Sequence, residues 1–122
     1  MARRLVSLRI EDILQAIERA RQIVSGTSLD AFENDWEKRW LIERAIEIVS
    51  EASRHLGGDV WASQGAIPWK KIAGIGNVLR VGYDQIAPDV LWNVVHTQFA
   101  PLEAACRAEL PRIQAYEAAE KD

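Results

Sequence analysis

The side chains of this chain that are best suited to chemistry lie close together between positions 77 and 84. Asn77, Arg80, Tyr83 and Asp84 fall within eight residues, and Lys70 and Lys71 precede them. A guanidinium group can brace a phosphate through paired hydrogen bonds, and an ammonium group attracts it as a point charge. The segment could therefore hold a few phosphates. On charge alone, an ordinary solvated helix face accounts for these lysines equally well.

The charges of the chain are unevenly distributed along it. The formal net charge is −3, which argues against a protein that coats nucleic acid without regard to its sequence. Between Arg54 and Tyr83, however, four cations accompany the single acid Asp59. From Asp84 onward, seven acids accompany three bases. This distribution favours a confined positive patch over a broad basic surface.

The elements that position these residues are predicted to be helices. Apolar residues recur at three-and-four spacing, and no segment alternates convincingly between apolar and polar residues. We expect helices over about residues 7–24 and 35–56, from Pro68 through Tyr83, and from Pro88 onward, with a short helical turn ending near Asn34. Pro101 should kink or split the last helix. These expectations describe an all-α bundle of four main helices plus a kinked or broken C-terminal helix, in one domain spanning residues 1–122.

The apolar pattern also predicts which side chains are buried. In the 35–56 helix, one apolar face is expected to contain Trp36, Trp40, Leu41, Ala45, Ile48, Ala52 and Leu56, widened by Ile42, Ile46 and Val49. Residues 57–67 are expected to be irregular and anchored by Trp61. The inner stripe of the last helix is expected to contain Val90, Leu91, Val94, Val95, Phe99 and Leu102. The close spacing of Gly74, Gly76 and Gly82 indicates either the close approach of another backbone or local bending, and we favour the close approach of a second helix.

Composition excludes several classes of protein. A chain of 122 residues fits one domain with a core of its own. A single cysteine, Cys106, cannot form an intramolecular disulfide, which suits a reducing cytoplasm, and no apolar run or leader pattern indicates a membrane or secreted protein. His55, His96 and Cys106 have no metal-ligand spacing, so no metal or cofactor is predicted. The histidines fit surface or capping positions, and Cys106 fits the core.

Four segments, in this order, are similar to those of a known family. They read EDILQAIERA, LIERAIEIVSEASRHL, IPWKKIAGIGNVL and PDVLWNVV. Over roughly residues 8–110 the chain resembles the HepT-like toxins, which are HEPN ribonucleases of bacterial toxin–antitoxin pairs. The motif of that family is an Arg, a polar residue that is usually Asn, and then a His, one spacer and a Tyr. Asn77 and Tyr83 match this motif, whereas Gly76 stands where the Arg is usual and Val81 where the His is expected.

The resemblance implies a HEPN-type helical bundle that forms a homodimer and cuts RNA without a metal. The Arg and His of the motif meet at the cleft between the two copies, and a nucleotidyltransferase antitoxin silences the toxin by attaching AMP to the motif Tyr. Carried onto this sequence, the catalytic positions are Gly76, Asn77, Arg80, Val81 and Tyr83. The RNA-binding set is Lys70, Lys71, Arg80 and Asp84, and the modified residue is Tyr83. A structural role for the Tyr83 ring is compatible with this assignment.

The two departures from the motif predict impaired or absent catalysis. Valine has no proton to exchange, and the loss of a general acid or base typically lowers a rate by about 100- to 10,000-fold. Arg80 could reach the phosphate in place of the Arg missing at position 76. The sequence therefore favours an impaired toxin. Two alternatives remain open: a catalytically dead HEPN dimer that binds antitoxin, RNA or nucleotide, and a purely structural helical module.

Overall fold

The computed structural model describes residues 5–81 and 87–120, with the backbone alone described at Arg80 and Val81. The described residues form seven α-helices and one π-helical segment, and no strand. In chain order they are α1 (Val6–Val24), α2 (Leu29–Glu33), α3 (Trp36–Arg54), α4 (Gly58–Ser63), α5 (Trp69–Val81), α6 (Pro88–Asn93), η1 (Val94–Gln98) and α7 (Phe99–Glu120). The all-α prediction is confirmed.

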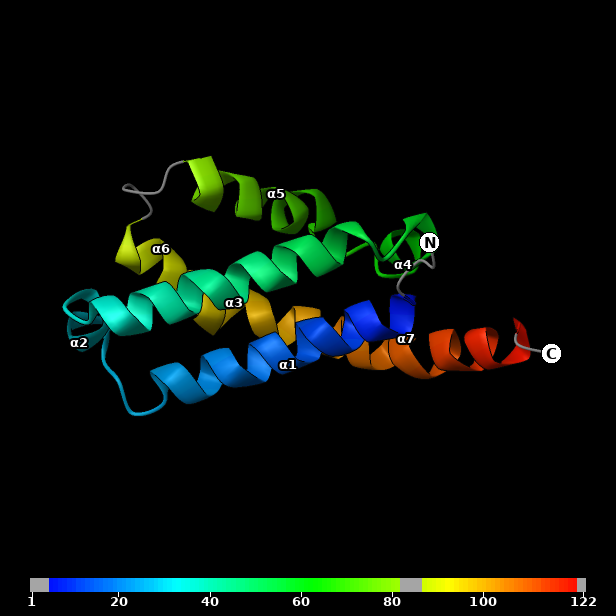
Figure 1. Ribbon diagram of the computed structural model, residues 1–122, viewed down its shortest axis with the longest axis horizontal. Coiled ribbons are helices and arrows are strands. Elements are labelled where there is room, and N and C mark those ends of the chain that lie inside the picture. The colour runs from blue at the N-terminus through cyan, green and yellow to red at the C-terminus, as the bar shows by residue number, and fades with distance from the viewer. Residues whose placement is uncertain (1–4, 82–86, 121–122) are drawn as a thin grey trace.

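The four longer helices are α1, α3, α5 and α7, and each runs antiparallel to the next of the four along the chain (Figure 1). α3 lies in the middle, with α5 along one side of it and α1 and α7 along the other, and α3 makes its main contacts with α1 and α5. The start of α1 and the end of α7 meet at one end of the bundle, where the Ser7 amide donates a hydrogen bond to Glu117 Oε2 at 3.1 Å. This arrangement leaves the outer face of α5 open to a partner or ligand.

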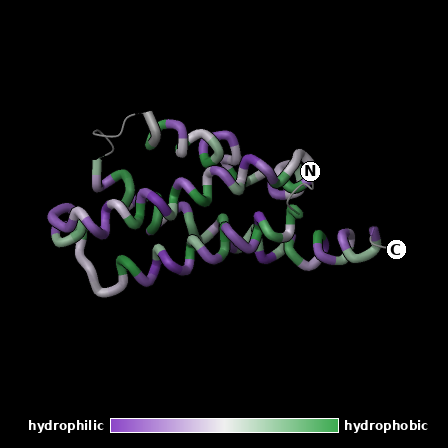
Figure 2. Tube along the Cα trace, in the orientation of Figure 1, coloured by the Kyte–Doolittle hydropathy of each residue, from purple (hydrophilic) through white to green (hydrophobic). Residues whose placement is uncertain are grey.

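The core follows from the apolar stripes of amphipathic helices. Banding of apolar and polar residues runs along the longer helices (Figure 2). Ile10, Ile13 and Ile17 of α1 are fully buried and pack in the same cluster as Ile42 and Ile46 of α3. Burial of each such side chain contributes about 1.5–3 kcal/mol. The same cluster contains Phe99 and Leu102 of α7, so the core lies between α1, α3 and α7.

The predicted apolar face of α3 is confirmed at Ala45, Ala52 and Leu56, which are buried, and is wrong at its N-terminal end. Trp36, Trp40 and Leu41 are more than half exposed, at 54%, 65% and 54%. Ile42, Ile46 and Val49, which the sequence placed at the margin, are at most 2% exposed. α1 and α5 cover only part of the wide apolar arc of α3. The part that contains Trp36 and Trp40 therefore stays exposed to solvent.

The segment after α3 is more regular than predicted. Gly57 takes a positive φ of 91°, which glycine adopts without the steric cost that a side chain brings, and α4 follows immediately. Trp61 on α4 donates a hydrogen bond from Nε1 to the Ser53 carbonyl at 3.1 Å. Its ring stacks on that of Trp69, with centroids 6.1 Å apart. Trp61 is thus the anchor that the sequence predicted, but on a short helix.

The C-terminal region is broken, as predicted, before Pro101. The π-helical segment η1 separates α6 from α7, and Pro101 follows it in the first turn of α7. Pro111 lies inside α7, which continues through it to Glu120. Val90 is 47% exposed, so its assignment to the inner stripe is wrong. Leu91, Val94, Val95, Phe99 and Leu102 from the same stripe are buried.

Within the described ranges, no helix is both long and apolar enough to cross a lipid bilayer. No group of three or more His, Cys, Asp or Glu side chains gathers there in a way that could hold a metal ion.

Candidate functional site

Helix α5 carries the motif region, and its first turn fixes where it begins. The Pro68 carbonyl accepts hydrogen bonds from the amides of Lys71 and Ile72, each at 3.1 Å. Proline suits this position because its fixed φ is compatible with a helix start. Trp69, Ile72 and Leu79 are at most 8% exposed and hold the inner face of α5 in the core. The residues on the opposite face are left accessible.

Gly76 lies at the closest approach of α5 to α3. Its amide donates a hydrogen bond to Ser50 Oγ at 3.0 Å, and the Ser50 hydroxyl donates to the Ala73 carbonyl at 2.8 Å. A Cβ atom added at Gly76 would lie 2.7 Å from Ser50 Oγ and 3.1 Å from Ser50 Cβ. The first of these distances is shorter than real Cβ contacts. The prediction that a glycine permits close helix approach is therefore confirmed at Gly76.

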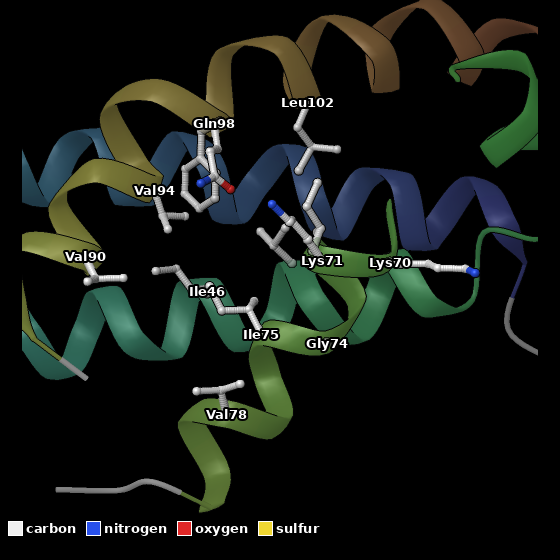
Figure 3. A pocket seen from close by; sticks show the side chains of 13 residues that line it. Ile46, Lys70, Lys71, Gly74, Ile75, Val78, Val90, Val94, Gln98 and Leu102 are labelled. Atoms are coloured by element: carbon white, nitrogen blue, oxygen red, sulfur yellow. The ribbon is translucent and has the colours of Figure 1, made fainter. Parts of the chain in front are cut away.

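Gly74 has a different environment. A Cβ atom added there would meet no neighbour within 4 Å, so this glycine is not required by a helix contact. It lines an apolar groove of about 380 Å³ between α5 and the α6–α7 region. Ile46 and Val49 of α3 also line this groove, and Figure 3 shows Ile46 among the side chains around it. Lys71 extends over the groove in this view, whereas Lys70 points away from it.

The described motif residues are accessible, with the exception of Gly76. Asn77 is exposed and interacts with another group, and Lys70, Lys71 and Val78 are exposed as well. Arg80 and Val81 form the last turn of α5, but their side chains lie outside the description. Tyr83 and Asp84 fall in the 82–86 gap and are likewise outside the described residues. Helix α5 thus presents Asn77 and two lysines on accessible positions.

A charged cluster at the C-terminal end of α3 was missed by motif analysis. Glu51 Oε2 lies 3.3 Å from Arg54 Nη2, and Glu51 Oε1 lies 3.0 Å from His55 Nε2. Arg54 Nη2 is also 3.7 Å from the position of a Cβ atom added at Gly76. The spacing of 51, 54 and 55 could have indicated a helical cluster, but nothing in the sequence places it against α5.

Two further acids lie on α3, N-terminal to Ser50. Burial raises the pKa of the Glu43 carboxyl, Arg39 lowers it, and the neighbouring Glu47 raises it further. Glu47 forms a weak, exposed ion pair with Arg44, with 3.9 Å between Glu47 Oε2 and Arg44 Nη1. Because α5 runs antiparallel to α3, its last turn extends from Gly76 toward the part of α3 that carries these acids. A carboxyl with a raised pKa keeps its proton to higher pH than an exposed one.

The remaining candidates for nucleophile or acid–base roles are placed away from the motif. His96 is exposed, and its ring stacks on Trp92 with centroids 4.1 Å apart. Cys106 is 2% exposed, and burial together with Glu103 and Glu109 raises the pKa of its thiol to about 12. A thiol that stays protonated at neutral pH is a poor nucleophile. Cys106 is therefore a core residue, as the sequence predicted.

Comparison with known sequences decides the family. The sequence model of the family described as "Ribonuclease HepT-like" matches residues 13–109, which is well over half of the chain. This chain belongs to the HepT-like ribonuclease family. The match contains the whole of α3 and α5, so the Ser50–Gly76 contact and the Arg54 cluster lie inside the HepT-like region.

Curated relatives agree with this HepT-like assignment. A protein of Methanocaldococcus jannaschii that carries the name of an RNase is 30% identical over 78% of this chain and 87% of its own length. A protein of Thermococcus cleftensis named ribonuclease HepT is 29% identical over 77% of this chain and 86% of its own. A Caldanaerobacter subterraneus protein named an RNase is also 29% identical, over 77% and 84%. No solved structure matches the chain significantly.

Gly76 and Val81 stand at the positions where the resemblance predicts the Arg and the His of the HepT-like motif. The structure gives a physical reason why the departure at position 76 is tolerated. Ser50 fills the space next to Gly76 and bonds its amide, so the α3–α5 contact is built around the missing side chain.

Proposed function

We propose that this HepT-like chain is the toxin component of a HEPN/nucleotidyltransferase pair, and that it binds RNA through α5 but cuts it poorly. The observation that carries the proposal is the family match together with accessible Asn77 and Lys71 on the motif helix. RNA carries one negative charge per phosphate, and exposed lysines beside an amide supply both attraction and hydrogen bonds.

Weak cleavage follows from the two replaced motif residues. Cutting RNA without a metal requires a group that takes the proton of the ribose 2′-hydroxyl and one that protonates the leaving oxygen. An imidazole does this near neutral pH, whereas the isopropyl group of Val81 cannot. Gly76 contributes no side chain at all. The chain would thus retain RNA binding and lose most of the rate.

The test is RNA cleavage in EDTA by the wild-type chain and by Val81→His, with Val81→Asn as the matched control. Asparagine is polar and of similar reach, but it has no group that titrates near neutral pH. We expect Val81→His to cleave much faster than the wild type and Val81→Asn, with a rate that depends on pH around the imidazole pKa. Equal cleavage by all three would show that a group other than the residue at position 81 does the proton transfer. Absence of both RNA binding and cleavage in every variant would refute the RNA-directed function.

The nucleotidyltransferase partner is tested separately. The chain is incubated with ATP and the nucleotidyltransferase encoded beside it, and intact mass is then measured. An added AMP that maps to Tyr83 supports the toxin–antitoxin pairing, and the Tyr83→Phe variant should gain no mass. An unmodified wild-type chain contradicts the pairing.

A second candidate is a catalytically dead HEPN dimer that binds antitoxin or RNA. The packing at position 76 favours it, because a side chain cannot be added there without displacing Ser50. The Val81→His experiment separates the two candidates. Cleavage by that variant indicates a toxin that needs one residue for its activity, whereas RNA binding without cleavage in every variant indicates the dead dimer.

A further inference from the structure

Gly76 of α5 and Arg54 of α3 lie next to each other at the contact between the two helices, where Gly76 itself is buried. The Cα–Cβ direction at Gly76 leads toward α3, where Arg54 Nη2 lies 3.7 Å from the position of the added Cβ atom. This is an ordinary van der Waals distance. The guanidinium of Arg54 therefore lies beside the point from which a side chain at position 76 would extend.

Arg54 is held in this position by its own helix. Its Nη2 lies 3.3 Å from Glu51 Oε2, and its side chain is 35% exposed. Glu51 also contacts His55 Nε2 at 3.0 Å. A guanidinium that is partly buried and held by an ion pair on one edge loses less conformational entropy when its other edge binds an anion. Arg54 is thus oriented without being sealed from solvent.

A comparison within α3 shows that this environment is not common to its arginines. Arg44 also pairs with a glutamate three positions away, Glu47, but at 3.9 Å and with a side chain that is 70% exposed. Arg44 lies at another groove, which is formed by α1 and α3. Arg54 is therefore partly buried, has a closer glutamate partner and lies beside Gly76. Arg44 has none of these three features.

We infer that Arg54 supplies from α3 the phosphate-binding guanidinium that position 76 of α5 lacks. This inference rests on the proposed RNA-directed function. Asn77, the next residue after Gly76, is exposed, so a phosphate bound at Arg54 would lie beside the motif face of α5. The planar guanidinium can donate two parallel hydrogen bonds to a phosphate, and the Glu51 contact leaves donors of the fork for this purpose.

The test measures binding of a fluorescein-labelled, 12-nucleotide single-stranded RNA by anisotropy, in EDTA, over a series of NaCl concentrations. Arg54→Gln should weaken binding about tenfold or more, as expected for loss of a charge-assisted hydrogen-bonded contact. It should also reduce the slope of log affinity against log salt by about 0.7, the value for one phosphate contact on a single strand. Arg54→Lys should keep the slope and lose several-fold in affinity, because it retains the charge without the fork.

Arg44→Gln is the matched control, because it removes an arginine of the same helix in the same type of ion pair. Its affinity and salt slope should equal those of the wild type. If the wild type binds and Arg54→Gln binds equally well with an unchanged slope, the role of Arg54 is refuted while the proposed function stands. If the wild type does not bind RNA at all, both are refuted.

A rescue variant separates phosphate binding from a structural role of Arg54. The triple variant Ser50→Gly, Gly76→Arg, Arg54→Gln opens the space next to position 76 and moves the guanidinium back onto α5. It should recover most of the affinity and the full salt slope lost in Arg54→Gln. Circular dichroism confirms that the variants are folded. If the folded triple variant binds as weakly as Arg54→Gln, a guanidinium from position 76 and one from position 54 do not serve the same phosphate site, which contradicts the inference.

Discussion

The hydroxyl of Ser50 accepts a hydrogen bond from the backbone amide of Gly76 across the contact between α3 and α5, with an N–Oγ distance of 3.0 Å. Ser50 is fully buried, and the same hydroxyl donates to the Ala73 carbonyl. One small polar side chain therefore joins two turns of the motif helix to the central helix of the bundle. The orientation of α5, and with it the direction in which Asn77 faces, depends on this contact.

Removal of the Ser50 hydroxyl should destabilise the protein, whereas removal of the Ser53 hydroxyl should not. Ser53 is also fully buried, but its Oγ has no hydrogen-bond partner among the described residues. Ser50→Ala loses two hydrogen bonds and should lower the free energy of unfolding by about 1–2 kcal/mol. Ser53→Ala removes an unpaired polar atom and should be neutral or slightly stabilising. Urea denaturation measures both, and equal losses would contradict the Ser50 contact.

Alanine substitutions at Gly74 and Gly76 should have opposite effects on stability. Alanine is favoured over glycine within a helix by about 1 kcal/mol. At Gly74 the added methyl group meets nothing within 4 Å, so Gly74→Ala should stabilise by about that amount. At Gly76 it would lie 2.7 Å from Ser50 Oγ, and overpacking of this kind typically costs about 1–3 kcal/mol. Gly76→Ala should therefore be net destabilising in thermal unfolding, and a stabilised variant would show that α3 and α5 separate easily.

The fold could be predicted from the sequence because helix periodicity and stop signals are local. The boundaries of α1 and the start of α3 next to Asp35 follow from spacing and residue type alone. The exposure of Trp36 and Trp40 could not be predicted, because the apolar arc of α3 is wider than its neighbours cover. Which part of such an arc is buried depends on where the other helices pack, and this is a property of the whole bundle.

The candidate site was only partly predictable for a similar reason. A motif locates Gly76 and Asn77 along one helix, but Arg54 approaches Gly76 from another helix, 22 positions earlier in the chain. The glycine cluster correctly predicted close approach at Gly76 but not at Gly74, and Gly82 lies outside the described residues. Sequence spacing shows that glycines permit a contact. It does not show which of them makes one.

The stability of the protein should fall on acidification, in part because of Glu109. Its carboxylate is 5% exposed. Hydrogen bonds from Arg112 and Gln64 lower the pKa of Glu109 below its ordinary value, burial opposes them, and Ser63 adds a further bond. Since the folded-state pKa is depressed, the resulting stability is present above the unfolded-state pKa of about 4.3 and is lost as the pH falls through the lower folded-state value.

Glu109→Gln tests this assignment. At pH 7 the variant should be less stable by about 1.5 kcal/mol or more, since charge-assisted hydrogen bonds link α7 to the end of α4. The difference from the wild type should shrink between about pH 5 and pH 3. The exposed Glu18, replaced by glutamine, serves as the control and should change little at either pH. A Glu109→Gln deficit that is constant with pH would exclude the ionised carboxylate as its cause.

A carboxylate at position 78 should dissociate the homodimer that the HepT-like family predicts. Val78 follows Asn77 on α5, is 55% exposed and lines the apolar groove, so it is suited to contact a second copy. A charge placed in a dry interface costs several kcal/mol, and each 1.4 kcal/mol is a tenfold change in affinity.

By light scattering at micromolar concentration, the wild type should have the mass of a dimer and Val78→Asp that of a monomer. Leu8→Asp, a control on α1 at a position that is 39% exposed, should remain dimeric. A monomeric wild type would remove the basis for a shared cleft, whereas a dimeric Val78→Asp variant would place the interface elsewhere than on this face of α5.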